Sequence, residues 1–177
     1  MHRLFVAIEL PIAVRDRLLA AMGGVSGARW QRDDQLHLTL RFIGEVDRHA
    51  AQDIAAALGG VYAAPFELAL RGTGTFGRRG VPETLWAAVT PHDAVTTLHA
   101  KVDQALRRAG MALEARAYAP HITLARLGRH SGPVAEFVTA TALGGPAFTV
   151  SGFALYESTL TRDGADYRTV ERYSLQG

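Results

Sequence analysis

Two short motifs carry the residues of this sequence that best suit acid–base chemistry. His37-Leu38-Thr39-Leu40 and His121-Ile122-Thr123-Leu124 are near copies of each other. Each motif is expected on a strand, where successive side chains point to opposite faces. The apolar residues of each motif would then face the core. The histidine and the threonine would lie side by side on the other face.

A pair of histidines suits proton transfer in both directions. Imidazole titrates near pH 6.5, so one ring can accept a proton while the other donates one. Such general acid–base help is worth about 10²–10⁴-fold in rate. The hydroxyls of Thr39 and Thr123 can donate to the non-bridging oxygens of a phosphate. The motifs therefore predict His37 and His121 as catalytic residues that cleave a phosphodiester without a metal, and leave open which is the acid.

The elements that must position the motifs repeat along the chain. Strand, proline-led helix, strand, helix and strand are expected over residues 3–70 and again over residues 84–155. A proline opens the first helix of each copy, 26 residues before the first motif histidine and 30 before the second. Matched elements at similar offsets indicate a duplication. We therefore expect one domain, residues 1–177, of two pseudosymmetric lobes with both motifs across one central cleft.

Hydrophobic periodicity predicts the individual elements. Strands are expected at residues 3–9, 36–43, 66–70, 84–89, 121–127, 148–156 and 167–174. Helices are expected at residues 11–22, 47–58, 91–109 and 134–143. The glycine- and arginine-bearing stretch 71–80 is interpreted as a loop at the rim of the cleft, able to meet RNA phosphates.

Composition narrows the class of protein. The sequence has no cysteine, which excludes disulfides, thiolate metal sites and a cysteine nucleophile. Eighteen of the 19 basic residues are arginine, yet a formal net charge of +2 supports nucleic-acid binding only weakly. The first apolar run, Leu4 to Ile8, is too short for a signal peptide or a membrane span. We expect a cytoplasmic protein with no membrane partner, no metal and no cofactor.

Further residues extend the match between this chain and a known family. They are Arg3–Ile8, Trp30, Arg41–Val46, Gly74–Phe76, Leu85–Trp86, Pro120, Ala125–Arg126, Glu157–Ser158 and Gly164–Tyr167. With the two motifs, they make the chain resemble the 2H phosphoesterase superfamily, and within it the RNA 2′,3′-cyclic phosphodiesterases, also called 2′-5′ RNA ligases. Gly77, where many relatives have proline, and Ala119, where arginine is frequent, depart from the pattern.

The resemblance implies an α+β fold, a bilobal duplication with two antiparallel sheets lining the cleft and helices packed outside. It implies hydrolysis of RNA 2′,3′-cyclic phosphate ends to 2′-phosphates, and a weak reversible 2′-5′ ligation of tRNA halves. In this scheme His37 protonates the leaving 3′ oxygen, and His121 activates water. The expected partner is RNA with 2′,3′-cyclic phosphate or 2′-phosphate ends, bound by a monomer.

Three more residues are candidates for substrate binding. Arg126 fits the family pattern His-x-Thr-x-x-Arg as a phosphate ligand, although it reaches the His121 face only if the strand ends or bends after Leu124. Phe42 can stack a base, although strand alternation places it with the core. Arg41 shares the His37 face and can bind a backbone phosphate; a solvated arginine at a strand end is the alternative.

Two other functions stay open at the level of sequence. One is a phosphodiesterase of the same superfamily for another small substrate, such as ADP-ribose 1″,2″-cyclic phosphate or 2′-5′ oligoadenylate. The other is a non-catalytic module that binds RNA ends. The physiological RNA, the nucleotide preference and the balance of hydrolysis and ligation are not determined by these motifs.

Overall fold

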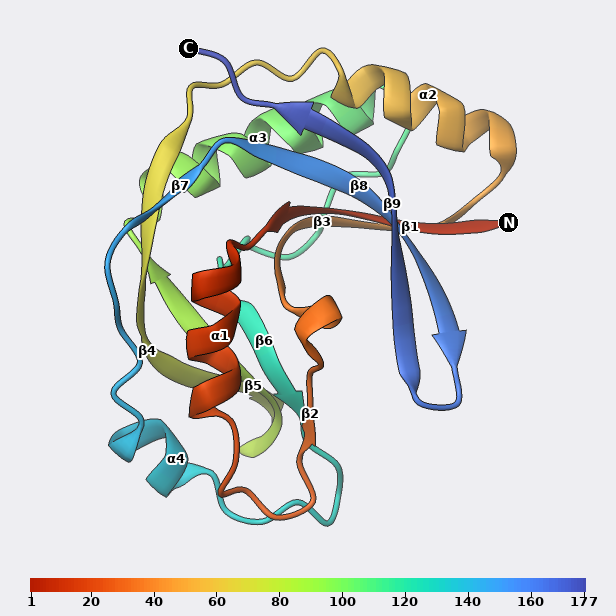
Figure 1. The fold of residues 1–177 in the computed structure, drawn as a ribbon. Helices are drawn as coiled ribbons and strands as arrows, with labels where there is room; N and C mark the ends of the chain where they lie inside the picture. Colours follow the sequence, from red (N-terminus) through yellow and green to blue (C-terminus); the bar gives the residue numbers. More distant parts are fainter.

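The computed structural model describes all residues, 1–177, as one antiparallel arrangement of strands with helices packed on it (Figure 1). The order of strands across it is β7-β4-β5-β6-β3-β1-β8-β9, with β2 beside β6. The strands are β1 (His2–Glu9), β2 (Arg29–Trp30), β3 (His37–Val46), β4 (Phe66–Arg78), β5 (Val81–Thr90), β6 (Ile122–Arg126), β7 (Phe148–Val150), β8 (Gly152–Thr161) and β9 (Gly164–Ser174). The helices are α1 (Ile12–Ala21), α2 (Arg48–Leu58), α3 (Asp93–Arg108) and α4 (Ala135–Ala140), with a short 3₁₀ turn η1 (Asp33–Gln35).

The strands form two halves that meet at the motifs. One half is β3-β1-β8-β9 and the other is β6-β5-β4-β7. They are joined by a single residue pair between β3 and β6, Leu38 opposite Ile122. Both residues are fully buried, and each is the second residue of its motif. The expected α+β fold is confirmed, and this pair connects the two expected antiparallel sheets into one path.

Each half contains strands from both of the expected repeat units, residues 3–70 and 84–155. The last strand of the first unit, β4, pairs with β5, and β8 of the second unit pairs with β1. The helices are divided between the halves in the same way. Helices α2 and α3 pack together on the half that holds β1 and β3, while α1 and α4 lie with the half that holds β4, β5 and β6 (Figure 1). The buried apolar side chains accordingly form one continuous core.

Two expected boundaries are corrected by strand pairing. The stretch 71–80 is not a loop, because β4 continues to Arg78 and returns through a two-residue turn with positive φ at Arg79 and Gly80. Gly74 is required within this strand, since a Cβ there would overlap the indole ring of Trp86. The strand expected at residues 148–156 divides into β7, which pairs with β4, and β8, which pairs with β1.

Other expected elements are found close to their predicted places. Helix α2 begins after Asp47, whose carboxylate accepts a hydrogen bond from the Ala50 amide, as expected of an N-cap. The hairpin β8–β9 turns at residues 162–163, between the strands expected at residues 148–156 and 167–174. The long helix after Pro91 is α3, with its buried residues on one face. No helix of the chain is long and apolar enough to cross a bilayer.

Candidate active site

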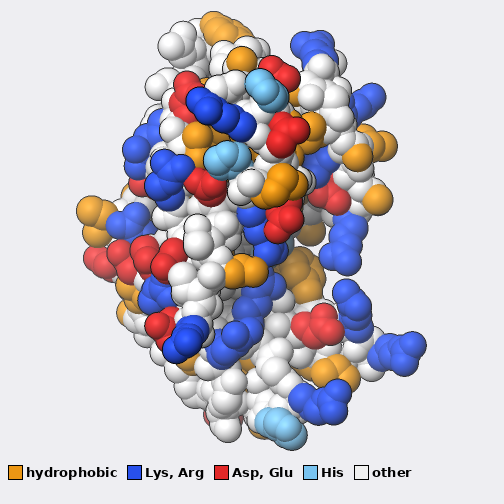
Figure 2. Space-filling view, turned by 90° about the vertical axis from the view of Figure 1, so that its right-hand side faces the viewer, with side chains coloured by type: hydrophobic (Ala, Val, Ile, Leu, Met, Phe, Trp, Pro, Cys, Tyr) orange, Lys and Arg blue, Asp and Glu red, His pale blue; other side chains and the backbone are white.

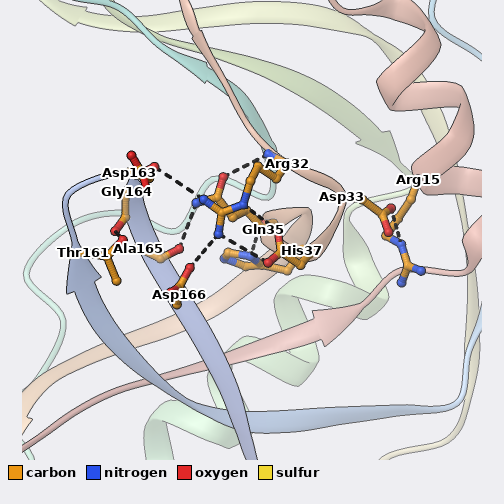
Figure 3. Close-up of polar contacts among 11 residues, drawn as sticks. Arg15, Arg32, Asp33, Gln35, His37, Thr161, Asp163, Gly164, Ala165 and Asp166 are labelled. Atoms are coloured by element: carbon orange, nitrogen blue, oxygen red, sulfur yellow. Dashed lines mark hydrogen bonds and ion pairs between the residues drawn. The ribbon is translucent and has the colours of Figure 1, made fainter.

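Both motif histidines are held by the same backbone contact. The Nδ1–H of His37 donates to the Gln35 carbonyl at 2.7 Å, and the Nδ1–H of His121 donates to the Ala119 carbonyl at 2.7 Å. Each acceptor lies two residues before its histidine; Figure 3 shows the first pair. A hydrogen bond on one ring nitrogen decides which tautomer is present. The Nε2 atom of each ring is therefore the one without a backbone partner, and His37 Nε2 lies 3.0 Å from Thr39 Oγ1.

A β-bulge interrupts β3 directly after Thr39. In the pairing with β1, Ala7 lies opposite Thr39 and Val6 lies opposite Arg41, so Leu40 is an extra residue. Such an insertion moves the following side chains to the opposite faces of the strand.

The bulge reverses the expected orientations of the next two residues. Arg41 was expected on the His37 face, but only 8% of it is exposed and its guanidinium contacts the carboxylates of Asp103 and Glu114 at 2.9 and 3.2 Å. The expectation that Arg41 binds a substrate phosphate is therefore corrected: it is a buried, paired group. Phe42 was expected to point into the core, but it is 59% exposed, with its ring 5.9 Å from that of Phe5.

A second bulge lies at the equivalent place in β6. In the pairing with β5, Leu85 lies opposite Ala125 and Trp86 lies opposite Thr123, so Leu124 is the extra residue. This is the bend that Arg126 needs in order to share the face of His121. Its guanidinium donates to Thr84 Oγ1 at 3.2 Å.

The two bulges make Phe42 and Arg126 equivalent by position. Each follows its motif histidine by five residues, and their partners across the ladder are Phe5 and Thr84. One half of the site therefore presents an aromatic pair, and the other presents an arginine beside a hydroxyl. Aromatic faces suit a base, and arginine suits a phosphate. Two similar motifs are thus followed by chemically different residues at equivalent positions.

Aromatic rings surround both imidazoles. The ring of His37 lies 5.0 Å from Phe5 and 5.3 Å from Tyr167, and that of His121 lies 4.8 Å from Phe76, between ring centres. These rings exclude water and disfavour the charged form of histidine.

The pKa values of both histidines are lowered. Burial is the main cause of the shift of the His37 pKa to about 4, and the charges of His121 and Arg126 add to it, against the hydrogen bond to Gln35. The His121 pKa is lowered first by burial and then by Arg126, also against its backbone hydrogen bond. Both rings are therefore mainly neutral near pH 7 before a substrate binds. A phosphate anion placed between them favours protonation of one ring.

A hollow of about 480 Å³ is lined by Phe5 and Tyr167, whose rings contact His37, although neither motif histidine lines it. Its other charged and aromatic lining residues are Arg3, Arg29, Trp30, Phe42, Arg126 and Asp163. Figure 2 looks onto the side of the molecule that carries the β8–β9 hairpin and shows Lys and Arg side chains around a recess. A larger hollow of about 630 Å³ lies between α2 and α3 and contains none of the candidate site residues.

Hydrogen bonds connect the β8–β9 hairpin to η1 beside His37. The motifs alone did not indicate this contact. Arg32 donates to the Asp166 carboxylate at 2.7 Å, and the Gln35 side-chain amide donates to the Ala165 carbonyl at 2.8 Å (Figure 3). Gln35 thus binds the hairpin through its side chain and His37 through its backbone carbonyl. The sequence does offer one signal for the role of Gln35. It lies two residues before His37, just as Ala119 lies two residues before His121.

The candidate residues fall into two groups. Phe42 and Arg126 line the hollow, and His37 feels the charges of His121 and Arg126. Thr39 lies beside His37, and Thr123 lies on β6 opposite Trp86. Arg41, in contrast, is buried behind β3 and paired with carboxylates. No group of three or more His, Asp or Glu side chains is arranged to hold a metal ion.

Comparisons with known proteins agree with this architecture. A sequence model described as the 2′-5′ RNA ligase superfamily matches residues 12–162. An RNA 2′,3′-cyclic phosphodiesterase of Thermus thermophilus is 36% identical, and the alignment covers 99% of this chain and 91% of that protein. One from Geobacillus stearothermophilus is 30% identical over 98% of this chain, which spans only 57% of that protein's length. The crystal structure of Escherichia coli LigT complexed with 3′-AMP has a TM-score of 0.82 and 26% identity, covering 99% of both chains.

The chain belongs to the 2′-5′ RNA ligase superfamily. The family expected from the paired motifs is confirmed. The expected class of enzyme, a hydrolase acting on phosphodiester bonds, is confirmed with it.

The electrostatic account of the site can be checked by titration. In the unliganded protein the His37 imidazole should titrate near pH 4, and His121 should titrate below 6.5. Arg126→Gln should raise both pKa values, because it removes a positive charge that opposes protonation. NMR of the ring nitrogens measures this directly. The exposed Arg129→Gln is the matched control, and pKa values of 6.5 or above in the wild type would contradict the account.

Proposed function

We propose that this chain hydrolyses RNA 2′,3′-cyclic phosphate ends to 2′-phosphates by metal-independent, two-histidine general acid–base catalysis. The observation that carries the proposal is the matched anchoring of His37 and His121, which leaves two Nε2 atoms for proton transfer. The names of the curated relatives, RNA 2′,3′-cyclic phosphodiesterases, support the choice of substrate.

The reaction needs one proton acceptor and one proton donor. His121 Nε2 accepts a proton from water as the water oxygen forms a bond to phosphorus. The bond from phosphorus to the 3′ oxygen breaks, and protonated His37 donates its Nε2 proton to that oxygen. The products are a 2′-phosphate and a free 3′-hydroxyl. The extra proton on His121 then leaves through solvent, and His37 is reprotonated for the next turnover.

The remaining residues stabilise the charge that develops on phosphorus. Thr39 and Thr123 donate to the non-bridging oxygens, and Arg126 balances their negative charge. In the free site neutral His37 accepts a hydrogen bond from Thr39 at 3.0 Å. Once His37 is protonated, its Nε2 becomes a donor, so the Thr39 hydroxyl is released toward the phosphate.

The substrate is placed by both halves of the cleft. Phe42, exposed beside Phe5, stacks on the terminal base, while the phosphate lies between the histidines and Arg126. The 3′-AMP complex of E. coli LigT supports nucleotide binding in a fold of this kind. The proposal extends to RNA ends such as tRNA halves, to the reverse 2′-5′ ligation, and to a monomer acting in the cytoplasm.

The experiment that tests this function is hydrolysis of a dinucleotide 2′,3′-cyclic phosphate in excess EDTA, with 2′- and 3′-phosphates separated. The wild type should form the 2′-phosphate. His37→Ala and His121→Ala should each lose at least about 10²-fold in turnover while remaining folded, because each removes one proton transfer.

The exposed His130→Ala is the matched control and should react as the wild type does. A 3′-phosphate product, dependence on metal, or full activity in a folded histidine variant would contradict the mechanism. If the wild type leaves RNA ends intact, a panel of ADP-ribose cyclic phosphate and 2′-5′ oligoadenylate tests the other substrates. Inactivity on all of them would leave an RNA-end binding module.

The role of Phe42 predicts a selective effect on affinity. Stacking of a base on an aromatic side chain is worth about 1–3 kcal/mol, so Phe42→Ala should raise KM by about 5- to 160-fold with little change in kcat. Tyr62→Ala is the matched control, since Tyr62 is equally exposed (63% against 59%) but lies at the α2–α3 hollow. An unchanged KM in Phe42→Ala would remove the stacking role.

A further inference from the structure

We propose that His99 and Tyr118 are positioning residues that hold the β3 bulge, and with it Thr39, in the geometry that the reaction requires. The inference rests on the proposed function. Neither residue faces the substrate: each acts through the backbone of β3, from α3 and from the irregular segment that precedes His121.

The two residues supply hydrogen-bond donors at the bulge. The Thr39 carbonyl accepts a bond from the Tyr118 hydroxyl at 3.0 Å, and the Leu40 carbonyl accepts one from His99 Nδ1 at 2.8 Å. A bulge interrupts the ladder of backbone hydrogen bonds, and a buried carbonyl without a partner is costly. Donors from outside the sheet therefore favour the bulged strand over a regular one.

His99 and Tyr118 act as one unit. Their rings are stacked, with centres 3.9 Å apart and planes 5° from parallel. Burial raises the pKa of Tyr118, so its hydroxyl remains a donor. The stack connects helix α3 to the segment before His121, and both members bond to consecutive carbonyls of β3.

The same segment also carries the second motif. Tyr118 lies three residues before His121, and the Ala119 carbonyl between them accepts the His121 Nδ1–H. Arg41, the residue after the bulge, donates to the Ala112 carbonyl of this segment. These contacts tie the strand that carries His37 to the segment that delivers His121, and thereby set the spacing of the two imidazoles.

The second bulge is held differently, which makes the inference testable by side-chain substitution. The Leu124 carbonyl, equivalent to that of Leu40, accepts a bond from the backbone N–H of Gln31 at 2.8 Å. A side-chain change can therefore release the first bulge and leave the second intact.

The test compares two replacements of His99. His99→Phe keeps a ring over Tyr118 but removes the donor to Leu40, whereas His99→Asn offers an amide N–H in place of Nδ1–H. Since small misplacements of a catalytic group can cost about 100-fold, we expect His99→Phe to lower kcat by about 10- to 100-fold with KM nearly unchanged. His99→Asn should recover most of the loss. Tyr118→Phe, which removes one hydroxyl, should lower kcat in the same way.

His92→Phe is the matched control, because His92 is exposed at the start of the same helix and makes no side-chain hydrogen bond there. A folded His99→Phe or Tyr118→Phe variant with wild-type kcat would overturn this inference but not the proposed function. If His99→Phe and His99→Asn lose kcat equally, and each has a lowered Tm, then His99 contributes only to stability. That result would also overturn the inference. An inactive wild type would overturn the proposed function, and this inference with it.

Discussion

The bulge that follows the threonine in each motif strand, at Leu40 and at Leu124, controls what this site presents. Without the bulges at Leu40 and Leu124, the period of two would bury Phe42 and Arg126. An unpaired buried arginine is costly; Arg41, the arginine that the first bulge does bury, has two carboxylate partners. The bulges thus place the ring of Phe42 and the guanidinium of Arg126, which has no carboxylate partner, on the face of the histidines, and every role assigned to these residues depends on that register.

The two motifs meet at the centre of the molecule, where the two halves of the strand arrangement join. The two motif strands meet at one buried pair, Leu38 and Ile122, so the histidines that precede them emerge close to the line where the halves join. Matching carbonyls select the same tautomer in both rings. Unequal surroundings then give the rings different electrostatics, so two similar motifs can support an acid and a base.

Local patterns predicted most helices and strands, because side-chain periodicity and helix-start residues such as Asp47 are encoded in short segments. The side of the strand on which Arg41 and Phe42 lie could not be predicted from short segments, because a bulge depends on the register with a partner strand. The placement of β4 beside β5, and of β8 beside β1, was not predictable either. It depends on which strand edges pair in space. Residues 71–80 have a loop-like composition, yet Gly74 is needed because the ring of Trp86 covers it.

The central claim is that two histidines with lowered pKa values share one proton during turnover. The most direct measurement is kcat/KM for a 2′,3′-cyclic phosphate dinucleotide from pH 4 to pH 9, since this quantity reports the ionisations of the free enzyme. The active form holds one proton on the pair, and both pKa values lie below 6.5. We therefore predict a bell-shaped profile with its maximum on the acid side of neutrality and a steady fall above pH 6.5. A profile that is flat or rising between pH 6.5 and 8.5 would contradict the account.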